Sequence, residues 1–355
     1  MKKNCRKREA DSANGGKRGR RISVQTIFLI AAVVVSCLVV VYVAIVMDHG
    51  RNGHAQAAGS KLRLEDIPFD GGRAYEHLKQ LCAIGPRRSG SKGMEKQQKL
   101  LAAHFRELGG QVKLQKFNAR HPVDGSKVPM ANLVVHWHPD RKERILLCAH
   151  YDTLPFPMLD PVNPRGTFVG ANDGASGVAV LMELARAMPK LESRYGVDFV
   201  LFDGEEFIFH PKGDFFLGSE HFAAEYRRQR LPYKYRWGVL LDMVGDKDLD
   251  IYQEGHSMEW RDTRPLVEQI WATARRLGVR EFVPRVKHDI LDDHLALHGA
   301  GIPTCDIIDY DYTDDRNQNL WHTQGDTADQ CSALSLAKVG WVIQEWLESL
   351  KVSGE

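Results

Sequence analysis

The 355-residue sequence contains only six cysteines and lacks any Cys-X-X-Cys pair. Without such pairs, a structural zinc site built from thiolates is not expected. Two of the six cysteines precede residue 48, and one disulfide among the other four stays possible in an oxidising compartment. Burial is the simpler expectation for Cys148 and Cys305, because both lie in apolar runs. The four cysteines concerned are Cys82, Cys148, Cys305 and Cys331.

The chain has little net charge, and its excess of positive charge is confined to one end. Residues 1–21 contain nine Lys or Arg and two acidic residues, a net charge of +7; since the whole chain has a formal net charge of +2, the remaining residues carry −5. This basic tail contains no aromatic residue. Nucleic acid is therefore not an expected partner, because its binding needs basic residues spread over a folded surface, often with aromatic side chains among them.

Charged residues are absent from residues 22–47, which are rich in Val, Ile, Leu and Ala. These 26 residues are enough to cross a membrane as a helix, and the basic residues before them favour a cytoplasmic N-terminus. We therefore expect a cytoplasmic tail (1–21) and a transmembrane signal-anchor helix (22–47), with the rest of the chain in a periplasm or secretory lumen. A cleaved signal peptide is the alternative, because Ala55-Gln56-Ala57 resembles a cleavage site.

Predicted strands and helices alternate beyond a polar linker at residues 48–61. This alternation predicts an α/β fold with a mostly parallel central sheet and helices on both faces. Because the sequence shows no internal repeat, residues 62–355 are expected to form one domain. Short apolar runs predict strands at 132–138, 145–149, 197–202, 237–241 and 302–308, and helical spacing predicts helices at 94–108, 178–188, 265–277 and 334–350.

Histidines and acidic residues follow several of these predicted strands. Ligands of open α/β sheets bind beyond the carboxyl ends of the strands, so these side chains should crowd one edge of the sheet. Carboxylates that lie so close together repel one another unless a cation neutralises them. Histidine and carboxylate without thiolate are the ligands typical of a catalytic zinc site. The segments concerned are His150-Tyr151-Asp152, Gly170-Ala171-Asn172-Asp173, Asp203-Gly204-Glu205-Glu206, Asp242 and Trp321-His322-Thr323.

Each segment alone has a simpler explanation. Asp173 could cap a helix, Glu205 and Glu206 could lie in a solvated loop, and Asp292-Asp293 could begin a helix. Their joint occurrence, in order and at strand ends, is what favours a functional site.

The order of these segments is similar to that in the zinc aminopeptidase family with co-catalytic metals, and within it resembles the glutaminyl cyclases. The resemblance implies a zinc-exopeptidase-like fold and a zinc-dependent catalytic domain at residues 62–355. It implies that Asp173, Glu206 and His322 bind zinc, and that Glu205 is the general acid and base. The segments that match are His150-Tyr151-Asp152, Gly170-Ala171-Asn172-Asp173, Phe202-Asp203-Gly204-Glu205-Glu206, Leu240-Leu241-Asp242, Asp292-Asp293-His294 and Trp321-His322-Thr323.

The same resemblance implies a second set of metal ligands. In the two-metal peptidases, the equivalents of His150, Asp173 and Asp242 hold a second zinc ion, with that of Asp173 bridging. One zinc ion per subunit is therefore expected and two are possible. Asp152 would contact His150 on the side away from the metal and so fix the orientation of its ring.

Features after Asp242 resemble the cyclases more closely. There the equivalent of Asp292 joins a catalytic carboxylate network with Glu205 and Asp242, and that of Trp321 forms a wall of a small substrate pocket. The sequence departs from animal cyclases in having Pro211 in place of a pocket tryptophan, Asp306 in place of a histidine, and Ala149 in place of one of a cysteine pair. These departures affect substrate binding more than metal binding.

The resemblance favours a glutaminyl-peptide cyclotransferase, which converts the N-terminal glutamine of a peptide or protein to pyroglutamate with loss of ammonia. A zinc aminopeptidase that hydrolyses N-terminal residues is the alternative. A more distant alternative is a receptor-like ectodomain without activity, although such proteins usually lose the metal-binding residues that this sequence keeps.

Overall fold

The computed structural model of the chain describes residues 59–209 and 212–351. The basic tail, the apolar run and most of the linker lie outside these ranges, and so does Pro211, so the expectations for them remain predictions. Within the described ranges, no helix is both long and apolar enough to cross a membrane. The backbone N–H and hydroxyl of Ser60 both donate to the buried Glu281 carboxylate, at 2.8 and 3.0 Å.

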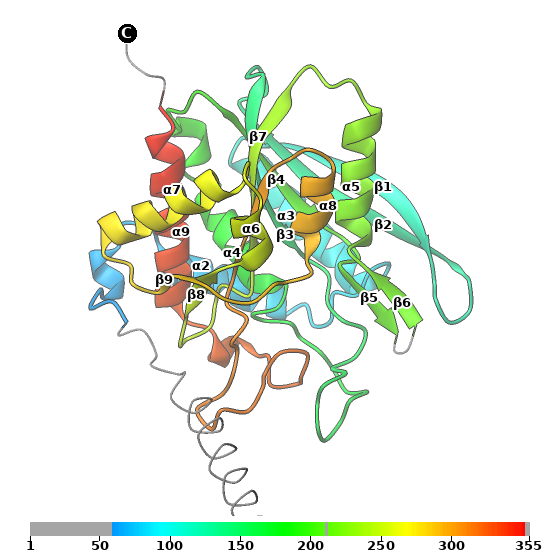
Figure 1. Cartoon of the computed structure of the whole chain (residues 1–355). Helices are drawn as coiled ribbons and strands as arrows, with labels where there is room; N and C mark the ends of the chain where they lie inside the picture. The colour runs from blue at the N-terminus through cyan, green and yellow to red at the C-terminus, as the bar shows by residue number, and fades with distance from the viewer. Residues whose placement is uncertain (1–58, 210–211, 352–355) are drawn as a thin grey trace, which may run out of the picture. The chain divides into compact units, whose positions relative to one another are not determined.

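A six-stranded sheet forms the centre of the fold, with the strand order β1-β2-β4-β3-β7-β10 (Figure 1). Strands β4, β3, β7 and β10 run parallel to one another, as the sequence predicted. Strand β2 is antiparallel to both of its neighbours, so the sheet is mixed. The strands are β1 (Gln111–Arg120), β2 (Lys127–Trp137), β3 (Glu143–His150), β4 (Gly196–Phe202), β7 (Lys234–Asp242) and β10 (Thr304–Ile308).

The prediction of a mostly parallel sheet is therefore wrong at the β1–β2 edge. Strand β1 has no buried residue, and its exposed and half-buried positions roughly alternate. An edge strand of this kind contains no apolar run that could reveal it in the sequence. The parallel strands are different, because β3 and β4 are buried almost throughout and read as continuous apolar runs.

Helices cover both faces of the sheet, as predicted (Figure 1). The larger apolar core packs five helices on one face, and a smaller core packs two on the other. The five are α2 (Gly71–Cys82), α3 (Lys92–Glu107), α4 (Ala175–Leu184), α7 (Arg264–Leu277) and α9 (Ala333–Ser349), and the two are α5 (Leu217–Arg228) and α8 (Asp293–Gly299).

Short elements complete the part of the chain that the structure describes. They are the antiparallel pair β5 (Glu206–Phe209) and β6 (Lys212–Phe215), the parallel pair β8 (Ile251–Gln253) and β9 (Phe282–Val286), α6 (Gly255–Glu259), and the 3-10 turns η1 (Leu64–Asp66), η2 (Met188–Lys190) and η3 (Ala328–Gln330).

The helix predicted at residues 178–188 is shorter at its end than expected. Helix α4 stops at Leu184, because the backbone N–H groups of Arg186 and Ala187 bond to carbonyls three residues back instead of four, and the 3-10 turn η2 follows. The four cysteines of the described residues are free thiols, and Cys148 and Cys305 are fully buried as expected.

Candidate active site

The predicted site residues meet at the carboxyl ends of the parallel strands. His150 and Asp242 are the last residues of β3 and β7, and Glu205 lies just beyond β4. Asp173 precedes α4 in a loop in which Gly170 and Gly174 have φ angles of 58° and 91°. A Cβ atom at Gly174 would lie 2.9 Å from the His150 ring, so only glycine allows this loop to approach so closely.

One set of metal donors consists of Asp173, Glu206 and His322. The His322 Nε2 atom lies 3.5 Å from Asp173 Oδ2 and 3.1 Å from Glu206 Oε1. All three side chains are buried, and neither of these two carboxylate oxygens has a hydrogen-bond partner among the described residues. Orphaned buried acceptors that converge on an imidazole nitrogen fit a bound cation, and this donor set suits a catalytic zinc ion.

A second set shares Asp173 and adds His150 and Asp242. His150 Nε2 lies 3.1 Å from Asp173 Oδ1 and 3.2 Å from Asp242 Oδ1. The two oxygens of Asp173 therefore face different imidazoles, which is the arrangement that a bridging carboxylate requires. The residues present fit either one cation or two.

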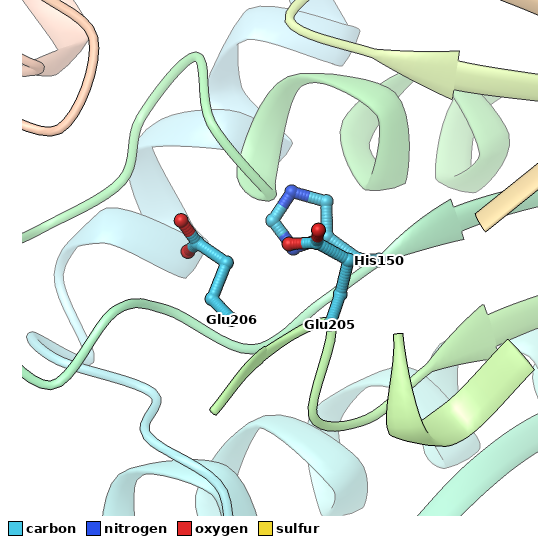
Figure 2. A group of neighbouring side chains, drawn as sticks. All are labelled: His150, Glu205 and Glu206. Atoms are coloured by element: carbon cyan, nitrogen blue, oxygen red, sulfur yellow. The ribbon is translucent and has the colours of Figure 1, made fainter. Parts of the chain in front are cut away.

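The adjacent glutamates Glu205 and Glu206 have different partners. Figure 2 shows the two side chains, Glu205 from the loop after β4 and Glu206 from the start of β5, with the carboxylate of Glu205 beside the His150 ring and that of Glu206 to one side. Glu205 Oε2 lies 3.7 Å from His150 Nδ1. Glu206 instead accepts a hydrogen bond of 2.8 Å from the backbone of Leu154 and places its other oxygen at His322.

Asp152 holds the segment that carries both glutamates. Its two oxygens accept the backbone N–H groups of Glu205 and Glu206, each at 3.1 Å. Its nearer oxygen lies 3.7 Å from His150 Nδ1, which is longer than a hydrogen bond. Its support of His150 stays a prediction, whereas its support of the glutamates follows from the geometry.

The environment sets the protonation of the site residues. Burial raises the pKa of Glu205 well above its usual range, and the charges of Glu206 and Asp292 add to this effect, although the His150 imidazole opposes it. Burial, with the charges of Asp242 and Asp293, likewise raises the pKa of Asp292. A carboxyl group of raised pKa is suited to general acid and base catalysis near neutral pH.

Asp292 both begins a helix and lines the pocket, so the two interpretations of the Asp292-Asp293 segment are compatible. Its side chain caps helix α8 by accepting the backbone N–H of Asp293 at 2.5 Å, so it does begin a helix. It also lines the pocket that contains Glu205 and Asp242, so it lies where the resemblance placed it.

The donors lie in a pocket with a volume of about 450 Å³. Trp321 forms part of its wall, with its ring centroid 3.8 Å from that of His322. Burial lowers the pKa of His322 to about 4, so this imidazole is neutral at pH 7, which is the form that binds a metal. The φ angle of His322 is 59°, an unusual backbone conformation of the kind that occurs at functional sites.

Two supporting residues were not found from the sequence. Asp326 accepts the backbone N–H groups of Asn172 and Asp173, and Ser89 donates to Asp203 at 2.7 Å. Both lie in irregular loops, where no periodic pattern indicates a role. The only available signal for Asp326 is its position four residues after His322.

Comparison with known proteins agrees with this geometry. Residues 132–347 match peptidase family M28. The crystal structure of Fimbriiglobus ruber glutaminyl cyclase is 40% identical and superposes with a TM-score of 0.75, over 81% of this chain and 97% of that one. A Zn-dependent exopeptidase from Parabacteroides distasonis is 31% identical with a TM-score of 0.71, over 79% and 99%.

Among curated relatives, aminopeptidase YwaD of Bacillus subtilis is 26% identical over 300 residues, which are 81% of this chain and 56% of YwaD. The chain therefore spans just over half of the length of that relative. The family match covers more than half of this chain, so the chain belongs to peptidase family M28. It is an enzyme with the fold and the donor residues of a zinc exopeptidase.

Proposed function

We propose that this enzyme is a glutaminyl-peptide cyclotransferase that acts on peptides or proteins with N-terminal glutamine. The observation that carries the proposal is the 40% identity to the Fimbriiglobus ruber glutaminyl cyclase over nearly the whole of that chain. The pocket beside the metal donors, which Trp321, Asp292 and Glu205 all line, supports the same activity.

The reaction joins two ends of one substrate residue. The α-amine of the N-terminal glutamine attacks its own side-chain amide carbon; the new C–N bond closes the ring, the bond to the amide nitrogen breaks, and ammonia leaves. A bound zinc ion supplies Lewis-acid polarisation of the amide carbonyl. Glu205 takes a proton from the attacking amine and returns it to the departing nitrogen. Because ring closure is intramolecular, the pocket contributes mainly by holding the substrate in a reactive conformation.

We propose that one zinc ion is held by Asp173, Glu206 and His322. These three residues come from separate segments of the chain and converge without another partner for Asp173 Oδ2 or Glu206 Oε1. In this assignment His150 lies beside Asp173 and Asp242 without holding a second zinc ion. Its replacement, His150→Ala, should then leave one equivalent of zinc bound in the purified protein.

An aminopeptidase is the second candidate, because the donor set of His150, Asp173 and Asp242 is complete. In that case His150→Ala should release one of two equivalents of zinc. Hydrolysis would need Glu205 to take a proton from water instead of from the substrate amine.

Two peptides distinguish the candidates directly. The purified enzyme is incubated with a peptide that begins with glutamine and with one that begins with leucine, and both ammonia and free amino acids are measured. A cyclotransferase releases ammonia from the first peptide and leaves the second intact. Release of free leucine without ammonia would overturn the proposal in favour of the aminopeptidase.

A further inference from the structure

The pocket of the active site opens through an apolar rim. Three of its lining residues are large apolar side chains that are also exposed to solvent: Leu291 (70%), Phe215 (39%) and Tyr310 (37%). Single exposed apolar side chains are common on protein surfaces, but several around the mouth of one pocket indicate a binding surface.

One side of the rim is continuous with the metal donors. His322 is 5% exposed, and its ring lies 3.8 Å from that of Trp321, which is half-buried. The Trp321 ring in turn lies 5.4 Å from the exposed Tyr310 ring. These three rings form an aromatic wall that leads from the centre of the site to the surface.

The other rim residues are also neighbours of site residues. The backbone N–H of Phe216 donates to the carbonyl oxygen of Glu205 at 3.0 Å, and the ring of the adjacent Phe215 lies 5.6 Å from that of Phe216. Leu291 directly precedes the buried Asp292 in the chain. The apolar rim therefore surrounds the point at which a substrate enters.

Apart from two histidines, the ionisable side chains of the described residues that line the pocket are acidic or tyrosine. The described residues that line it include six acidic side chains and neither Lys nor Arg. Five of the six surround the donor site, and the sixth, Asp289, is exposed near the rim. An acidic substrate side chain at the rim would meet like charge without a basic partner.

We propose that Leu291, Phe215 and Tyr310 bind the side chain of the second residue of the peptide substrate, and that they favour a large apolar residue over a polar or acidic one. The inference rests on the proposed cyclotransferase function. When the N-terminal glutamine lies beside the metal donors, the next residue lies about 3.3–3.6 Å further along an extended chain, on the way out to the rim.

The test compares three peptides of equal length that begin Gln-Leu, Gln-Ser and Gln-Glu, with ammonia release measured as kcat/KM. We expect Gln-Leu to exceed Gln-Ser by about tenfold, the effect of partly burying one leucine side chain, and Gln-Glu to be the slowest. Leu291→Ser and Phe215→Ser should each reduce the Gln-Leu to Gln-Ser ratio several-fold. Val123→Ser is the matched control: Val123 is also exposed, at 64%, but lies in the β1–β2 loop away from the pocket, so it should leave the ratio unchanged.

Zinc content and the thermal midpoint identify any variant that fails to fold. Because there are two rim variants, the test can still be made if one of them does not fold. Equal kcat/KM values for the three peptides, or a ratio that neither rim variant changes, would overturn the inference while leaving the cyclotransferase function intact. If none of the three peptides releases ammonia, the proposed function itself fails, and this inference fails with it.

Discussion

Asp326 accepts a hydrogen bond of 3.1 Å from the backbone amide of the metal donor Asp173. Its other oxygen accepts the Asn172 amide at 2.8 Å and the Tyr312 hydroxyl at 2.9 Å. Asp326 is fully buried and follows His322 by four residues. It therefore ties the loop that carries one metal donor to the loop that carries another, although the two are about 150 residues apart in the chain.

Asp326→Asn should weaken this connection. The amide side chain keeps one acceptor but turns an N–H group toward a backbone donor, which should cost about 1–3 kcal/mol of stability. Because Asp173 would lose its orientation, zinc retention should fall in parallel with the thermal midpoint. The control is Asp329→Asn, an exposed acid in the adjacent turn η3. Normal zinc content in Asp326→Asn after dialysis would show that the connection does not hold the metal site.

The neighbouring glutamates should respond differently to the same substitution. Glu205→Gln keeps size and hydrogen bonding but cannot exchange a proton near neutral pH, so kcat should fall by roughly 10²–10⁴ with zinc content unchanged. Glu206→Gln should instead lose zinc, because its Oε1 is directed at the donor site. The measurements are turnover of a Gln-initiated peptide and metal analysis of each purified variant. Near-normal turnover of Glu205→Gln would point to Asp292 as the proton carrier.

How far the sequence predicts this site depends on where each residue lies. His150 and Asp242 were predictable because each ends a buried strand that reads as an apolar run, and the carboxyl ends of parallel strands meet at one edge. Asp326 was not, because it lies in an irregular loop whose path depends on contacts far apart in the chain. For the same reason the sequence alone does not distinguish one zinc ion from two, since both donor sets are present.

The antiparallel direction of β2 was also not predicted, although the length of the connection that follows this strand indicates it. Only five residues, 138–142, separate β2 from β3. A crossover between parallel strands needs about a dozen residues or more, so a connection this short implies strands that run in opposite directions. The polar strand β1 gave no comparable signal, because none of its side chains is buried.

The start of the folded domain can be tested by truncation. A protein that begins at Gly59 keeps both hydrogen bonds of Ser60 to Glu281, whereas one that begins at Leu62 loses them. Both should be active, because no site residue precedes residue 62. The shorter protein should be less stable by about 1 kcal/mol, since Glu281 keeps Lys338 at 2.7 Å but loses its other partner. Equal unfolding midpoints in urea would show that Ser60 contributes nothing, and loss of activity in both would show that residues before 59 are needed.

The last prediction concerns a buried ion pair at the opposite ends of the strands from the metal donors. Arg144 lies near the start of β3 and donates to both oxygens of Asp198, one of them at 3.0 Å, and both side chains are buried. His136 lies 2.8 Å from the same carboxylate. Asp198→Asn should therefore destabilise the protein by about 3–5 kcal/mol at pH 7, because Arg144 would stay buried without a charge partner.

The pH dependence of this loss has a definite sign. Burial acts to raise the pKa of Asp198, but His136 and Arg144 outweigh it and hold the pKa below its usual value of 3.8. A lowered carboxyl pKa stabilises the folded state above the unfolded-state pKa, and the stabilisation is lost as the pH falls through the folded-state pKa. The difference in unfolding free energy between the original protein and Asp198→Asn should thus shrink as the pH falls below about 4. Urea unfolding across this range measures it, with the exposed Asp124→Asn as the control expected to leave stability nearly unchanged. A difference that grows as the pH falls below about 4 would mean that Asp198 is protonated, not ionised, beside Arg144.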